Sequence, residues 1–236
     1  MPSLKSLMAI AAGIAAAPGL ASAGVIDFTS GVWSGAGGSA AATRSFDGLG
    51  VTVRAINGTG GANALSFTGF DGKVPGSVCG PVLACRYDGV GIVDDEISYG
   101  NGRKEDVERV VVEFSNAVTV TGIHFFDLFF GTGGDPAPGE MAQVQAFFAG
   151  GGSTGFGVQQ ADTGTGWEFW SGTLADVTRI EFFADSYRLA SPEFSDFALA
   201  GIEVTGVPEP AGLALLGIGL AGLALRRRAA AARAES

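Results

Sequence analysis

Four acidic residues stand close together in the first half of the chain: Asp88, Asp94, Asp95 and Glu96. Carboxylate and loop carbonyl oxygens suit Ca²⁺, which takes about 6–8 oxygen ligands. Their spacing differs from that of an EF-hand loop, and the same residues could form a solvated acidic turn whose side chains accept hydrogen bonds from loop amides. The sequence therefore carries the hypothesis of a structural Ca²⁺ site here, with a purely structural turn as the alternative.

Candidates for catalysis are few. The single histidine, His124, lies between Ile123 and Phe125 in a strand pattern, and no Gly-x-Ser-x-Gly motif suggests a nucleophile for it. One histidine and no cysteine cluster exclude a typical zinc site. Paired carboxylates such as Asp94 and Glu96 could serve glycoside hydrolysis at a separation of about 5–9.5 Å, although two neighbours in one loop are weak evidence for it. We expect no enzyme, and a hydrolase with a dispersed active site is the alternative.

Aromatic side chains offer a second kind of chemistry, the stacking of sugar rings. If residues 167–170 form a strand, Trp167 and Phe169 share one face while Glu168 and Trp170 share the other. One of these tryptophans would then be exposed. We name Trp33 and Trp170 as candidate sugar-stacking residues, with core packing as the alternative. Together with the acidic loop, they make a calcium-dependent carbohydrate-binding module the second hypothesis for function.

The two cysteines, Cys79 and Cys85, are separated by five residues that include a glycine and a proline. In an exported protein this spacing predicts a disulfide that closes a small local loop. The loop-entropy argument gives such a bridge about 2–3 kcal/mol of stabilisation. A redox-active pair would favour a Cys-x-x-Cys spacing, which is absent.

The elements that must position these residues read as β-strands. Short runs rich in Val, Ile, Thr and Phe alternate with clusters of Gly, Asp, Asn and Ser, and 17 phenylalanines are available for a core. Gly122 interrupts the alternation of one strand and predicts a bulge. The predicted fold is all-β, a jelly-roll-like β-sandwich. The predicted strands are Val25–Phe28, Val51–Ile56, Ala64–Phe67, Arg109–Phe114, Val118–Phe126, Met141–Phe148, Trp167–Trp170, Val177–Phe183 and Phe197–Val204.

Charge narrows the range of partners. The chain holds 14 basic and 24 acidic residues, for a formal net charge of −10. Five of the basic residues, Lys5 and four arginines after residue 225, lie in the terminal segments, so the acidic excess is greater in the central part. Such a surface repels nucleic acid and anionic lipid headgroups. We therefore expect no nucleic-acid partner.

The first residues read as a secretory signal peptide. Lys5 precedes an apolar stretch from Leu7 to Ala17, Pro18-Gly19 breaks it, and Ala21-Ser22-Ala23 supplies the small residues of a cleavage site. Cleavage after Ala23 would make Gly24 the mature N-terminus. This predicts export through the Sec machinery and processing by signal peptidase.

The last residues read as a membrane signal. The sequence Val207-Pro208-Glu209-Pro210 should be extended, because each proline fixes its own φ and biases the preceding residue away from helix. The uncharged run Ala211–Leu225 is expected to be a single hydrophobic helix, although it is shorter than the ~20 residues of a typical span. Arg226, Arg227 and Arg228 follow and should stay cytoplasmic.

The motif, the apolar run and the arginine cluster, in this order, resemble the PEP-CTERM sorting signal of Gram-negative bacteria. The resemblance covers residues 207–228, with a short cytoplasmic tail at 229–236. It implies an exosortase-type enzyme as the processing partner. It also implies transient anchoring in the inner membrane, with the body periplasmic, followed by transfer to the cell surface or extracellular matrix.

The expected organisation is a signal peptide at 1–23, a β-sandwich at 24–206 and the sorting signal after it. Two targeting signals around a body without an evident catalytic set favour a structural or adhesive protein of the cell surface or extracellular matrix. We expect it to be associated with exopolysaccharide.

Overall fold

The computed structural model describes residues 22–70, 82–93, 96–99, 107–129, 140–159, 166–184 and 196–207. Most of these residues lie in β-strands, and the only helix among them is a 3₁₀ turn, η1, at Ser34–Ala36. The strands are β1 (Ser22–Asp27), β2 (Ala41–Phe46), β3 (Leu49–Asn57), β4 (Leu65–Ser66), β5 (Gly91–Ile92), β6 (Glu108–Phe126), β7 (Met141–Phe148), β8 (Ser153–Gln159), β9 (Glu168–Ala184) and β10 (Ala198–Val207). The all-β prediction is confirmed.

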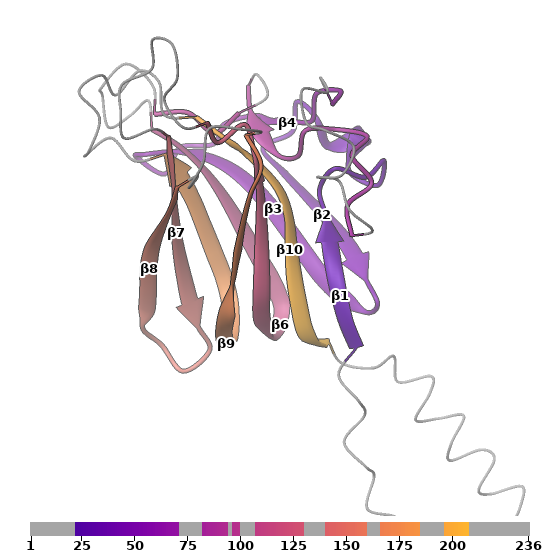
Figure 1. Ribbon diagram of the computed structural model, residues 1–236, viewed down its shortest axis with the longest axis vertical. Coiled ribbons are helices and arrows are strands. Elements are labelled where there is room, and N and C mark those ends of the chain that lie inside the picture. The colour runs from indigo at the N-terminus through magenta and orange to yellow at the C-terminus, as the bar shows by residue number, and fades with distance from the viewer. Residues whose placement is uncertain are drawn as a thin grey trace, which may run out of the picture.

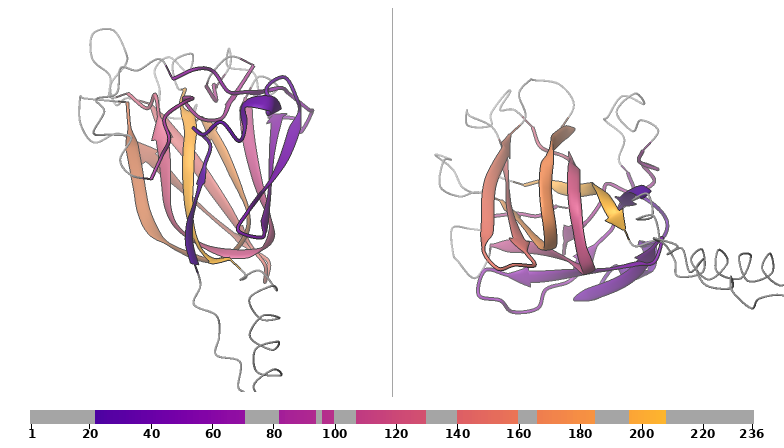
Figure 2. Two further views of the ribbon diagram at one scale, coloured as in Figure 1. Left: turned by 90° about the vertical axis from the view of Figure 1, so that its right-hand side faces the viewer. Right: turned by 90° about the horizontal axis from the view of Figure 1, so that it is seen from below.

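Eight strands form one antiparallel sheet in the order β1-β10-β6-β9-β7-β8, and a β2–β3 hairpin is attached to β6. The long strand β6 has two neighbours on one edge: its first half pairs with β3 and its second half pairs with β10. Strand β9 follows the other edge of β6 through both halves. The strands β6 and β9 therefore run through both layers of a sandwich-like fold (Figures 1 and 2).

This connection distinguishes the fold from the jelly roll that the sequence predicted. A jelly roll packs two sheets against each other, whereas here one sheet curves round on itself through β6 and β9 (Figure 2). The register of β6 against β9 shifts between Glu113 and Gly122, where the two layers meet. The sandwich-like description holds, and the separation into two independent sheets does not.

One apolar core fills the space between the layers. Every second side chain of a strand contributes to this core. In β3 the buried residues are Leu49, Val51, Val53 and Ala55, while the residues between them are more exposed. The large side chains at its centre are fully buried, among them Phe28, Trp33, Leu49, Ile123, Phe125, Phe182 and Phe197. The phenylalanines thus fill the core, as the sequence indicated.

A smaller apolar group covers the opposite face of β6 and β10, and we call this face the outer face. Leu83, Phe126, Ala198 and Ala200 are buried there. The segment 82–87 lies over this face because β1 and the residues after it hold its backbone. Asp27 accepts a hydrogen bond from the Ala84 amide at 2.8 Å, and the Thr29 hydroxyl accepts one from the Cys85 amide at 2.8 Å.

The described residues contain no helix that is long and apolar enough to cross a membrane. The segment for which the sequence predicts one, Ala211–Leu225, lies outside them, as do the predicted signal-peptide residues 1–21.

Candidate functional site

The end of the body that leads into the predicted sorting signal is built from the first and last strands. Ser22 in β1 is paired with Val207 in β10, so the two ends of the described chain lie side by side (Figure 1). Val207, the first residue of the predicted motif, is the last residue of β10. Pro208, Glu209 and Pro210 and the arginines 226–228 lie outside the described residues.

The predicted cleavage site falls inside β1. The strand begins at Ser22, two residues before Gly24, and a register shift separates Ser22 from Gly24 in the ladder with β10. A break after Ala23 would leave the paired stretch from Gly24 to Asp27 in place. The predicted cleavage is therefore compatible with the ladder, and it stays a prediction.

His124 is the most deeply buried ionisable group of the outer face. Its side chain is 4% exposed, and its Nε2 lies 3.0 Å from Glu203 Oε1. A carboxylate only accepts, so Nε2 carries the proton and donates it to Glu203. Nδ1 has no hydrogen-bond partner among the described residues, and in this tautomer it carries a lone pair and no proton.

Burial is the largest influence on the charge of His124, and it lowers the pKa of the imidazole. The hydrogen bond and charge of Glu203 act in the opposite direction, as does the charge of Asp27. The histidine therefore stays neutral in the fold at pH 7. Among the described residues His124 contacts Glu203, Phe169 and Trp167, which fits a histidine packed in a strand, as the sequence indicated.

Aromatic rings surround this histidine. Phe169 stacks on His124 with ring centroids 4.5 Å apart, and Trp167 lies nearly parallel to Phe169 at 6.3 Å. The shared face of Trp167 and Phe169 is thus as predicted. Gly122 makes room for the stack, because a Cβ there would lie 2.6 Å from the Phe169 ring. The register shift at Gly122 confirms the predicted bulge.

The predicted sugar-stacking tryptophans do not form an open platform. Trp33 is 0% exposed and stacks between Phe46 and Phe67 in the core, so its ring offers no face to a sugar. That assignment is wrong, because a lone aromatic before a glycine-rich turn gives no sign of its burial. Trp170 is half-buried and stacks on Phe156 at 4.7 Å, which covers one face of its ring.

The predicted Ca²⁺ ligands are only partly described. Asp88 is buried, with its Oδ2 3.3 Å from the Thr68 hydroxyl, and Glu96 is half-buried. Asp94 and Asp95 lie outside the described residues. In the described ranges no three His, Cys, Asp or Glu side chains are grouped to hold a metal ion. The Ca²⁺ site stays a prediction.

A different group of carboxyls was missed by the sequence analysis. Glu140, just before β7, makes a side-chain hydrogen bond to Asp196, just before β10, and the charge of Glu96 acts on it. Burial raises the pKa of Glu140 to about 10, and Asp196 adds to the rise, whereas a hydrogen bond from the Phe129 amide opposes it. The carboxyl pair therefore holds a proton at neutral pH.

The predicted disulfide involves the segment over the outer face. Cys85 is half-buried and disulfide-bonded, and its φ is 48°. Cys79, the only other cysteine of the sequence, lies outside the described residues. The pairing of these two residues stays a prediction.

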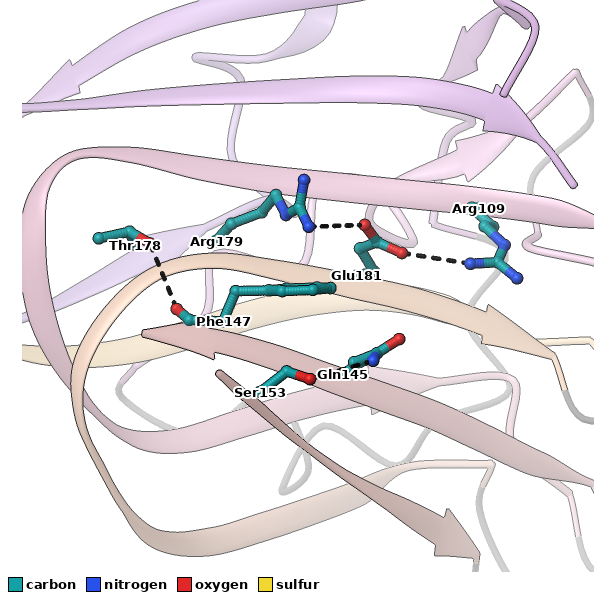
Figure 3. A network of polar contacts seen from close by, with 7 residues as sticks. All are labelled: Arg109, Gln145, Phe147, Ser153, Thr178, Arg179 and Glu181. Carbon is teal, nitrogen blue, oxygen red and sulfur yellow. Dashed lines mark hydrogen bonds and ion pairs between the residues drawn. The ribbon is translucent and has the colours of Figure 1, made fainter. Parts of the chain in front are cut away.

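The described surface also has a small cavity and a polar network. A cavity of about 230 Å³ lies between β1 and the β2–β3 turn, lined by Gly24, Phe46, Asp47 and Leu49 among others. It is smaller than most ligand pockets, which span about 300–1,000 Å³. Figure 3 shows a polar network on β6, β7 and β9, in which Glu181 binds Arg109 at 3.2 Å and Arg179 at 3.4 Å.

Comparison with known proteins concerns the end of the chain. Residues 206–228 match the family described as PEP-CTERM protein-sorting motif. A search of the curated proteins found no match to this chain. The matched stretch begins at the last residues of β10, so the folded body leads directly into it. The motif is the signal of exported proteins that exosortase sorts to the cell surface. The chain therefore carries a PEP-CTERM protein-sorting motif at residues 206–228, which supports a PEP-CTERM protein that is a substrate of exosortase.

Proposed function

We propose that the body of the protein, the domain formed by strands β1 to β10, is a non-catalytic structural or adhesive domain. We place it at the cell surface or in the extracellular matrix, in association with exopolysaccharide. The observation that carries the proposal is the direct junction between β10 and the sorting motif at residues 206–228. No linker separates the body from the signal, so whatever anchors the signal also holds the body.

The pairing of Ser22 with Val207 supports a defined orientation. Both segments that await processing leave the body at one end, the end where β1 starts and β10 stops (Figure 1). In the proposed intermediate this end faces the inner membrane from the periplasmic side, with the arginines at 226–228 in the cytoplasm. The opposite end of the sandwich is then presented away from the membrane.

The sorting step can be tested in the host with three forms of the protein. Because Val207 belongs to the β1–β10 ladder, the deletion should begin at Pro208 and leave the ladder intact. We expect the form that lacks residues 208–236 to be released, while the intact protein reaches the cell surface. A form that lacks only 229–236, beyond the matched stretch, is the control and should behave as the intact protein does.

Fractionation followed by intact-mass measurement of each form gives the location and both chain ends. Equal distribution of the intact and 208–236-deleted forms would contradict sorting by this signal. A thermal melt of the released form checks that the body still folds.

A calcium-dependent carbohydrate-binding role is the weaker candidate. The enclosed ring of Trp33 counts against it, and the half-covered ring of Trp170 supports at most one contact. Binding to a glycan array with Ca²⁺ and again after chelation tests this role. A flat array and unchanged melting after chelation would remove it.

A further inference from the structure

Among the described residues, three strands of the large sheet have a neighbour on one side only: β1, β2 and β8. Such edge strands invite pairing with another chain, and proteins usually protect them with charge, proline or a bulge. The ladder of β1 with β10 shifts in register between Ser22 and Gly24, as at a bulge. β2 carries Arg44, whose Nε donates to the Val32 carbonyl at 2.9 Å and so ties a crossing loop to this edge.

Strand β8 has none of these devices. Its sequence, Ser-Thr-Gly-Phe-Gly-Val-Gln, contains no charge and no proline, and its ladder with β7 is regular from Met141–Gln159 to Phe147–Ser153. It lies at one lateral border of the molecule (Figure 1). In a protein of formal net charge −10, an uncharged strand is a place where a second acidic copy can approach with little repulsion.

The direction of each backbone group in β8 follows from the hairpin. Phe148 donates to the Gly152 carbonyl at 3.3 Å, while Ala149 turns the other way and donates to Asp176 in the β9 direction at 2.8 Å. Alternation along an antiparallel pair then directs the amides of Thr154, Phe156 and Val158 toward β7. The amides and carbonyls of Ser153, Gly155 and Gly157, which are exposed, point to the side of β8 away from β7.

The residue types of β8 are symmetric about Phe156. Gly155 and Gly157 flank it, and the β-branched Thr154 and Val158 follow on either side. A two-fold axis at Phe156 would place Gly155 opposite Gly157 of the second copy, and Gly157 opposite Gly155. Both glycines direct their backbone groups outward, so this register matches donor to acceptor in both pairs.

We propose that β8 is a self-association edge, at which two copies of this chain join antiparallel through their β8 strands into one continuous sheet. The contact is isologous, as the near-symmetry of the strand requires. About four backbone hydrogen bonds would form across it, two in each Gly155–Gly157 pair. Phe156, which stacks on Trp170 at 4.7 Å, would meet Phe156 of the second copy at a Cα separation of about 4.5 Å.

The proposal goes beyond the proposed function and does not depend on the sorting signal. It supplies a way for copies concentrated at a surface to adhere to one another. One strand edge covers less than a standard interface of about 1,600 Å², so we expect a weak dimer with a Kd on the order of 100 µM.

Sedimentation equilibrium of the exported protein, purified from its host, tests the proposal with two variants at one position. Gly155→Pro removes an outward amide and places the ring against the second copy, and we expect a Kd at least about tenfold higher. Gly155→Ala is the matched control and should dimerise as wild type does, because its Cβ would meet only the Val144 carbonyl at 3.6 Å. A wild-type protein that remains monomeric to about 1 mM would overturn the proposal. Equal dimerisation of both variants would do the same.

Hydrogen exchange on the wild-type protein gives an answer that does not rely on folding of the proline variant. We expect the amides of Gly155 and Gly157 to exchange more slowly as the protein concentration rises. The amides of Thr154 and Phe156, which are directed toward β7, should be protected at every concentration. Exchange at Gly155 and Gly157 that is independent of concentration would contradict the dimer.

Discussion

The two faces of the layer formed by β10 and the second half of β6 are buried in different ways. On the inner face, Ile123, Phe125 and Ile202 are fully buried members of the apolar core. On the outer face, His124 and Glu203 form a hydrogen-bonded pair against the ring of Phe169. The comparison shows that one strand can be stabilised by apolar packing on one side and by a hydrogen-bonded pair on the other.

Register keeps these two faces apart. Side chains alternate along a strand, so a shift of one residue would move His124 into the core and Phe125 out of it. The bulge at Gly122 fixes the register, because both neighbouring ladders shift at this residue. Changes on either face should therefore have effects that differ in size and in kind.

Truncating the inner face should have the largest effect. We expect Phe125→Ala to lower the free energy of unfolding by about 3–5 kcal/mol, because the fully buried ring leaves a cavity between Phe182 and Phe197. Urea denaturation measures the loss. Phe169→Ala on the outer face removes a half-buried ring of the same size and should cost less; an equal or greater cost would break the comparison.

Adding volume to the outer face should have the second-largest effect on stability. We expect Gly122→Ala to cost about 1–3 kcal/mol, because its Cβ would lie 2.6 Å from the Phe169 ring and 3.0 Å from Glu203 Cδ. The double variant with Phe169→Ala should recover part of the loss, since the clash is removed. Additive losses in the double variant would show that the strain arises elsewhere.

Much of the fold could be predicted from the sequence. The strand Met141–Phe148 is found with its predicted bounds, and the bulge at Gly122 is confirmed. The predictions Arg109–Phe114 and Val118–Phe126 are parts of one strand, β6. Ser115 and Asn116, which lie between them, interrupt the apolar alternation without ending the strand, so the sequence pattern divided one strand into two.

Three strands, β2, β5 and β8, were missed. β2 and β8 lie at edges of the large sheet, β5 has only two residues, and β8 is rich in glycine, which has low β propensity. Pairing with β3, β4 and β7, respectively, gives these segments their structure. The local sequence of a strand does not show which other strand will pair with it.

The sites were harder to predict than the strands. Glu203 lies 79 positions from His124, and Asp196 lies 56 positions from Glu140. Such pairs are made by sheet register, which the sequence alone did not fix. The terminal signal, in contrast, is contiguous and needs no fold, so its prediction at residues 207–228 is confirmed by the match at 206–228.

The polar chemistry of the outer face should have the smallest and most specific effect. Because burial lowers the pKa of His124, the unfolded chain binds a proton that the fold does not, just below the ordinary pKa of 6.5. Stability should therefore fall as the pH drops below about 6.5. We expect Glu203→Gln to cost about 1 kcal/mol at pH 7, since a neutral amide replaces a charged acceptor.

The same substitution should lower the pKa of His124 further, because Glu203 opposes the effect of burial. His124 is the only histidine in the chain, so a single imidazole signal in an NMR titration follows it without assignment. Glu113→Gln, which removes an exposed carboxylate paired with Arg54 in the other layer, serves as the control and should leave this titration unchanged. An unchanged or higher pKa of His124 on Glu203→Gln would contradict the polar coupling of this pair.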